Sequence, residues 1–113
     1  MSAVVDDIVR RLSVVAEGDA GIAGKVMKFD GGEDGVVVID ATVRPAKISS
    51  TDRPADCTVM MAAPALRQIV TGEGSCGATY MRFVRGVEGQ QGLAVLVQPL
   101  LRRAAAAAAQ APR

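Results

Sequence analysis

The sequence predicts an α+β domain in which a mainly antiparallel sheet is covered on one face by helices. The chain has 113 residues, which is enough for one domain with its own core. Half of the residues are hydrophobic but only 3% are aromatic, so the core must be aliphatic. Helical and strand periodicities follow one another in the order helix, four strands, helices, strand, helix. Strands early in the chain and helices late are typical of an α+β fold.

The first helix is expected over residues 2–17. Ser2 can cap its start, and Gly18 is a natural end. One helical face is apolar and consists of Val5, Ile8, Leu12 and Val15. On the opposite face, the ion pairs expected at i,i+4 spacing are Asp6–Arg10 and Asp7–Arg11.

Four strands are expected next, at residues 22–30, 35–43, 44–50 and 57–61. The turn-forming residues between the first two strands predict an antiparallel hairpin. Pro45 cannot donate a hydrogen bond to a neighbouring strand. It therefore favours an edge position for the third strand.

Further helices and a fifth strand follow. Pro64 suits the first turn of a helix that Gly72 ends. Residues 75–80 are expected to add one helical turn. The alternation of side chains over residues 82–88 predicts the fifth strand.

The last helix is expected from residue 89 onward. Its apolar stripe consists of Leu93, Leu96, Val97, Leu100 and Leu101. Pro99 lies within this stripe and must either kink the helix or begin a second one. The alanine run over residues 104–109 has no apparent apolar face to bury. Residues 104–113 are therefore expected to fray as a tail outside a domain that spans residues 1–103.

The charge balance disfavours nucleic acid as a partner. The formal net charge is +1, from 13 basic and 12 acidic residues, so attraction to a phosphate backbone is weak. The N-terminal segment is acidic where a signal peptide would be basic. No uninterrupted apolar run approaches the roughly 20 residues that span a bilayer. We therefore expect a cytoplasmic protein.

The sequence offers no convincing catalytic or metal-binding group. Histidine is absent, and Cys57 and Cys76 form no metal-binding motif. Cys57 is expected to be a buried thiol with a raised pKa and not a nucleophile. The spacing Gly72-x-Gly74-x-x-Gly77 matches a dinucleotide-binding pattern, but a helix precedes it where the motif needs a strand. We expect a loop there, no cofactor, and no enzymatic activity.

The order and spacing of several segments resemble the sterol carrier protein type 2 domain. They are Ala55-Asp-Cys-Thr-Val-Met-Met, a helix ending in Thr71-Gly72, and Val87-Glu-Gly-Gln-Gln-Gly-Leu-Ala94. The likeness covers nearly the whole chain. It implies a five-stranded sheet with an apolar tunnel between sheet and helices. It also implies non-catalytic binding or transfer of a fatty acid, fatty acyl-CoA or sterol-like lipid.

The resemblance implies a tunnel wall drawn from the middle helix, the segment around the last strand, and the final helix. Its residues would be Leu66, Ile69, Val70, Tyr80, Met81, Phe83, Leu93, Leu96, Val97 and Leu100. Arg82 departs from the family pattern, which often has a neutral amide there. This side chain either points outward or holds a carboxylate or phosphate of the ligand.

Periodicity alone favours an ordinary core over a ligand pocket for the final helix. The alternative function is an interaction or accessory module that docks through this helix and presents a substrate to a partner enzyme. The partners to consider are a lipid or other apolar ligand, a membrane contacted transiently, a second copy in a homodimer, and a partner enzyme.

Overall fold

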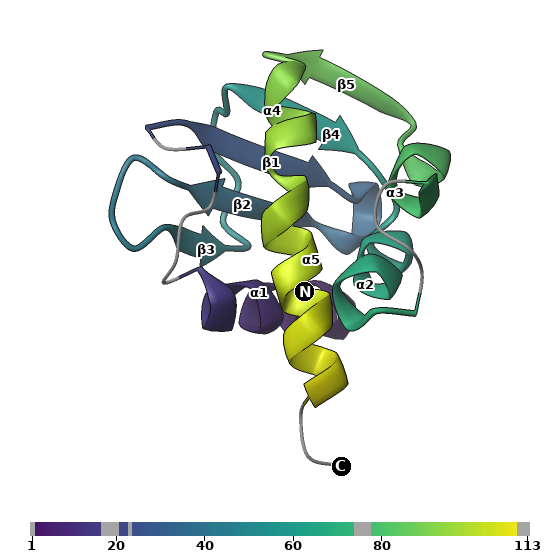
Figure 1. The fold of residues 1–113 in the computed structure, drawn as a ribbon. Helices are drawn as coiled ribbons and strands as arrows, with labels where there is room; N and C mark the ends of the chain where they lie inside the picture. Colours follow the sequence, from purple (N-terminus) through teal and green to yellow (C-terminus); the bar gives the residue numbers. More distant parts are fainter. Residues whose placement is uncertain (1, 17–20, 23, 74–77, 111–113) are drawn as a thin grey trace.

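The computed structural model describes residues 2–16, 21–22, 24–73 and 78–110. Its helices are α1 (Ala3–Val15), α2 (Ala63–Thr71), α3 (Ala78–Phe83), α4 (Gly92–Leu96) and α5 (Gln98–Gln110), with a short 3-10 helix, η1, at Gly32–Asp34. Its strands are β1 (Val26–Asp30), β2 (Val36–Asp40), β3 (Lys47–Ser49), β4 (Cys57–Met60) and β5 (Gly86–Gly89). Figure 1 shows α4 and α5 running across one face of the sheet, with α1 and α2 beside α5.

The five strands form one mixed sheet in the order β3-β2-β1-β4-β5. Strands β1 and β4 pair in parallel, and the other three pairs are antiparallel. The β1–β2 hairpin is therefore confirmed, and β3 lies at an edge, as Pro45 predicted. The predicted α+β class, with a five-stranded and mainly antiparallel sheet, is also confirmed.

The connection from β3 to β4 crosses the face of the sheet that the helices leave uncovered. Lys28 lies between Met27 and Phe29 in β1, so its side chain points away from theirs. Its Nζ lies 2.6 Å from a carboxylate oxygen of Asp52 in this connection. The Asp56 carboxylate accepts a hydrogen bond of 2.8 Å from the Val26 amide. These contacts hold the connection against the outer face, and the crossing allows β4 to pair in parallel with β1.

The ends of α1 and α2 follow the capping residues that the sequence predicts. The Ser2 hydroxyl accepts hydrogen bonds from the amides of Val4 and Val5 at the start of α1. Gly72 ends α2 in the left-handed conformation, with φ of 80°. The expected stop at Gly18 lies outside the described residues.

The strand predicted over residues 82–88 is wrong in its first half. Residues up to Phe83 belong to α3, and β5 begins only at Gly86. A Cβ added to Gly89 would lie 2.2 Å from the Asp56 carbonyl oxygen, and one added to Gly86 would lie 2.9 Å from Met60 Cε. Strand β5 has four residues, Gly86–Gly89, and both of its end glycines lie close to the segment around β4. The helical turn expected over residues 75–80 lies partly outside the described residues, and α3 is described from Ala78.

The final helix is divided at Val97, and Pro99 lies in the first turn of α5. Of the two outcomes expected for Pro99, a second helix is therefore the one that occurs. The expectation that the alanine run buries nothing is wrong. Helix α5 continues to Gln110, and Ala104 is only 2% exposed within the core cluster.

Residues Gly92–Gln110 form a helical stretch that is long and apolar enough to cross a bilayer by length and composition alone. This is the one such stretch in the described part of the chain. Its most apolar 18 residues have a mean hydropathy of 1.2, and 33% of this part is buried within the fold. A core helix meets the same criterion, and the inward face of this stretch lies in the core. The sequence does not show this stretch as one apolar run, because Arg102 and Arg103 interrupt it.

Candidate functional site

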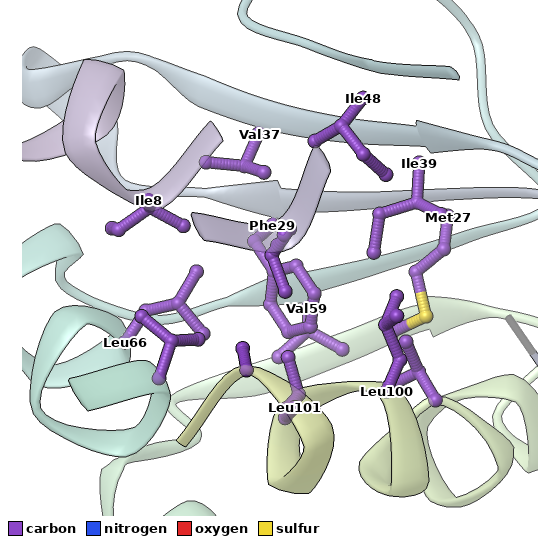
Figure 2. Close-up of a cluster of buried hydrophobic side chains, with 14 of the residues drawn as sticks. Ile8, Met27, Phe29, Val37, Ile39, Ile48, Val59, Leu66, Leu100 and Leu101 are labelled. Carbon is purple, nitrogen blue, oxygen red and sulfur yellow. The ribbon is translucent and has the colours of Figure 1, made fainter. Parts of the chain in front are cut away.

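A continuous apolar layer lies between the sheet and the helices. Among the described residues, every buried residue is of an apolar type, and the Tyr80 hydroxyl is a buried polar group among them. Figure 2 shows Leu100 and Leu101 of α5 pointing toward the strand residues Met27, Phe29 and Val59. An apolar group that entered this layer would meet apolar walls and few polar partners.

The inner face of the sheet forms the floor of this layer. Its side chains come from alternate positions of the strands, because successive residues of a strand point to opposite faces. The floor consists of Met27, Phe29, Val37, Ile39, Ile48, Cys57 and Val59. None of these residues was predicted to line a ligand site, although the period-two alternation of side chains in the strands could have identified most of them.

Helices α4 and α5 form the roof. Leu93 on α4 is 6% exposed, and Val97 and Leu100 are fully buried. These three residues follow one helical face at spacings of four and three, so they remain on the same side across the break at Val97. The roof thus consists of two helices, the five-residue α4 and the 13-residue α5, which meet at Val97.

Seven of the predicted site residues meet in this layer. They are Leu66, Ile69, Val70, Tyr80, Leu93, Val97 and Leu100, and all belong to one core cluster. The Tyr80 ring lies with its centroid 6.5 Å from that of Phe29, at an interplanar angle of 58°. The geometry brings these residues together, while their contact with a ligand stays a prediction.

The other four predicted residues lie at or near the surface. Met81 is 64% exposed and Arg82 is exposed, because α3 turns Tyr80 inward and the next two side chains outward. Phe83 is half-buried against the core cluster. On α4, Leu96 is 51% exposed. Of the two positions expected for Arg82, the outward one is observed.

Cys57 lies in the floor at the start of β4, close to α4. Burial raises the pKa of its thiol, and a hydrogen bond with the backbone of Ala94 partly opposes that rise. The thiol is therefore protonated at neutral pH and poorly suited to act as a nucleophile, as the sequence predicts. No group of three or more His, Cys, Asp or Glu that could hold a metal ion occurs among the described residues.

A hollow of about 330 Å³ lies elsewhere, where β1 and β4 end and α2 begins. Its lining consists of Asp30, Gly31, Gly32, Met60, Met61, Ala62 and Arg85. None of these residues was predicted to bind a ligand. The hollow is partly open to solvent and adjoins the core cluster at Met61, which is 2% exposed.

No protein-family model matches this chain, and no curated protein sequence does either. Solved structures do match in fold. The sterol carrier protein domain 2 of Helicoverpa armigera superposes with a TM-score of 0.66 at 19% identity, covering 91% of this chain and 89% of that one. This chain therefore has the sterol carrier protein 2 fold.

Two further structures with this fold agree. The UbiJ-SCP2 ubiquinone synthesis protein matches with a TM-score of 0.62 at 18% identity, over 89% of this chain and 95% of that one. The sterol carrier protein 2 of Aedes aegypti, solved in complex with palmitate, matches with a TM-score of 0.59 at 22% identity, over 89% and 96%. The resemblance to the sterol carrier protein type 2 domain that the sequence indicated is therefore confirmed for the fold.

Proposed function

We propose that this chain binds the apolar part of a lipid between the sheet and α4–α5 and transfers it without chemical change. The ligand classes are a fatty acid, a fatty acyl-CoA or a sterol-like molecule. The observation that supports this most is the almost wholly apolar layer beneath a roof that is divided at Val97 into the five-residue α4 and the 13-residue α5. The fold likeness to a protein solved with palmitate supports it further.

Burial of apolar surface supplies the binding free energy. Removing roughly 300 Å² of ligand surface from water is worth about 7 kcal/mol, before the cost of ordering the ligand is subtracted. Aliphatic walls suit flexible chains, since dispersion contacts have no directional demand. The polar head of the ligand stays at the edge of the layer, where water can solvate it.

Helix α4 is the element that moves when a lipid enters. It has only five residues, and its joint with α5 at Val97 is the break in the roof. Leu93 and Val97 fill the layer in this conformation. A ligand therefore displaces these side chains outward with α4, while α5 stays packed between α1 and α2.

A pair of variants on opposite sides of α4 tests the proposal. The wild-type protein, stripped of lipid with organic solvent and refolded, is titrated with a fluorescent long-chain fatty acid. Leu93→Trp fills the layer from its inner side, so affinity is expected to fall about tenfold or more. Val95→Trp adds the same ring on the outer side, where Val95 is 62% exposed, and affinity in solution is expected to stay unchanged.

Circular dichroism confirms that both variants fold. Failure of the folded wild type to bind any long-chain fatty acid, or equal affinities for the two variants, counts against the proposal. Mass analysis of the solvent extract identifies any lipid that the protein acquired in the cell.

A second candidate is an accessory role, in which the bound lipid is presented to a partner enzyme. The fold likeness to the UbiJ-SCP2 ubiquinone synthesis protein favours it. In this role the lipid would bind in the same apolar layer, and the protein would also bind a partner enzyme. Native mass spectrometry separates the two candidates, since a carrier acting alone gains only the mass of its lipid.

A further inference from the structure

We infer that the outer surface of α4 docks the protein on a neutral lipid bilayer. This surface consists of the side chains of Val95 and Leu96, and is called the α4 tip below. The inference rests on the proposed function, because docking there brings the bilayer to the helix that opens the apolar layer.

Helix α4 is apolar on both sides. Leu93 and the adjoining Val97 face the core, while Val95 is 62% exposed and Leu96 is 51% exposed. A surface helix normally has polar or charged side chains on its outer face. A helix that is apolar all round is expected to have apolar material on both sides, and here the outer side faces solvent.

The α4 tip also lies in a segment without charge. Residues 89–101 contain no Asp, Glu, Lys or Arg, although 22% of the whole chain is charged. By contrast, the exposed faces of α1 and α2 carry Arg10 and Arg67. Charged side chains are costly in the hydrocarbon region of a bilayer, so a charge-free surface is the kind that can insert there.

The size of the α4 tip argues for a bilayer and against a protein partner. Two side chains exposed to this extent present roughly 200 Å² of apolar surface. A stable protein interface buries about 1,200–2,000 Å² in total, or at least about 600 Å² on each partner. The α4 tip is too small for a second copy to cover stably. Burying about 200 Å² of apolar surface is worth at most about 5 kcal/mol, which corresponds to a weak and reversible membrane contact.

The end of α4 contacts the segment at residue 21. A Cβ added to Gly21 would lie 2.4 Å from the Leu96 carbonyl oxygen, so the chain at residue 21 packs directly against the end of α4. Figure 1 places α4 beside the edge strand β5, at the far end of the roof from the C-terminus. The side chains of Val95 and Leu96 are already exposed in this conformation, so they can contact a bilayer before α4 moves to admit a lipid.

Flotation of the full chain with neutral phosphatidylcholine vesicles tests this inference. The variants are Val95→Asp and Leu96→Asp, separately and together, and the control is Val14→Asp. Val14 is 66% exposed on α1, so the control places the same charge at an equally exposed valine elsewhere. The double variant is expected to lose vesicle binding at least about tenfold, while the control keeps wild-type binding.

High salt separates this docking from electrostatic attraction through exposed arginines such as Arg10 and Arg67. Binding through the α4 tip is expected to persist in high salt, because it involves no charge. The inference is overturned if the wild type does not float with the vesicles, if the double variant floats as well as the control, or if high salt abolishes binding.

Fatty acid titration of the same variants in solution tests the proposed function separately. Loss of vesicle binding by Val95→Asp alone, with fatty acid affinity retained, supports both proposals, because Val95 lies outside the predicted tunnel wall. If the wild type binds no fatty acid but the double variant still loses vesicle binding, only the proposed function fails. If the wild type binds fatty acid but the double variant still binds vesicles as the wild type does, only the inference about the α4 tip fails.

Discussion

Asp7 links the two helices that flank α5. Its carboxylate accepts hydrogen bonds of 2.9 Å from Nε of Arg11 and from Nε of Arg67, and a further one from Arg10. Burial by itself raises the pKa of Asp7, but the hydrogen bonds from Arg11, Arg67 and Arg10 lower it to about 2. One carboxylate therefore neutralises charge on α1 and on α2 at the same time.

Asp7→Asn is expected to lower the free energy of unfolding at neutral pH by about 1 kcal/mol, a value reduced for screening by water. A carboxyl group with a lowered folded-state pKa stabilises the fold above its unfolded pKa. The difference between wild type and variant should therefore be full at neutral pH and shrink as the pH falls from about 4 toward 2. Urea unfolding at several pH values measures it.

The control is Asp6→Asn, on the exposed neighbouring residue of the same helix. It should leave stability nearly unchanged across this pH range. A loss at Asp6 equal to that at Asp7 would mean that the first turn of α1 responds to any lost carboxylate, and not to the contacts of Asp7.

Gly89 and Gly92 differ sharply in what surrounds them. Gly89 has φ of 86° and lies against the Asp56 carbonyl, whereas a Cβ on Gly92 meets nothing within 4 Å. Gly89→Ala is expected to destabilise the fold by about 2 kcal/mol or more, through strain and the clash. Gly92→Ala should be neutral or slightly stabilising, because alanine favours helix. Thermal unfolding of both variants checks this, and similar melting temperatures would contradict it.

Local ion pairs could be predicted at the residue scale only in part. The Asp7–Arg11 pair follows from i,i+4 spacing and is confirmed. Arg10 was expected to pair with Asp6, but in the structure its guanidinium contacts Asp7. The contact between Arg67 and Asp7 spans 60 residues of sequence, and no local spacing could have indicated it.

At the scale of elements, α5 is longer than its composition suggested. Ala104 is four residues after Leu100 and three after Leu101, so it lies on the same buried face. Alanine is small, and the periodicity that marks leucine stripes is easily missed when the next member of the stripe is alanine. The helix thus continues past residue 103, where a tail was expected to begin.

Ala104→Asp is expected to destabilise the protein by about 3 kcal/mol, since it places a carboxylate in the apolar layer. Ala106→Asp makes the same change at an exposed position of the same helix and should cost less than about 1 kcal/mol. Urea unfolding compares the two variants. Equal stabilities would indicate that the alanine run is not packed on α1 and α2 in solution.

The misplaced start of β5 has a different physical origin. An alternating pattern over seven residues is compatible with the last turn of a short helix followed by a short strand. Strand β5 is defined by its pairing with β4, from Met60–Gly86 to Cys57–Gly89, and this pairing joins residues far apart in the sequence. Periodicity within the segment alone could not have located the boundary.

For the whole molecule, the α+β class and the number of strands follow from the sequence, whereas the strand order does not. The order depends on the connection over residues 50–56, which crosses the outer face and makes β4 the parallel neighbour of β1. The residues of the candidate site could likewise be predicted only in part. Residues with helical periodicity, such as Leu66 and Leu100, could be placed correctly, but the outward direction of Met81 depends on α3 being a helix.

The central claim is that the layer beneath α4 and α5 takes up an acyl chain. Methyl-resolved NMR of the lipid-stripped protein titrated with palmitate tests it most directly. The claim predicts that the methyl signals of Leu93, Val97 and Leu100 shift as palmitate is added, while those of Val14 and Val43, both exposed elsewhere, stay in place. Unshifted signals from the three buried residues at saturating palmitate, or shifts confined to surface methyl groups, would contradict it.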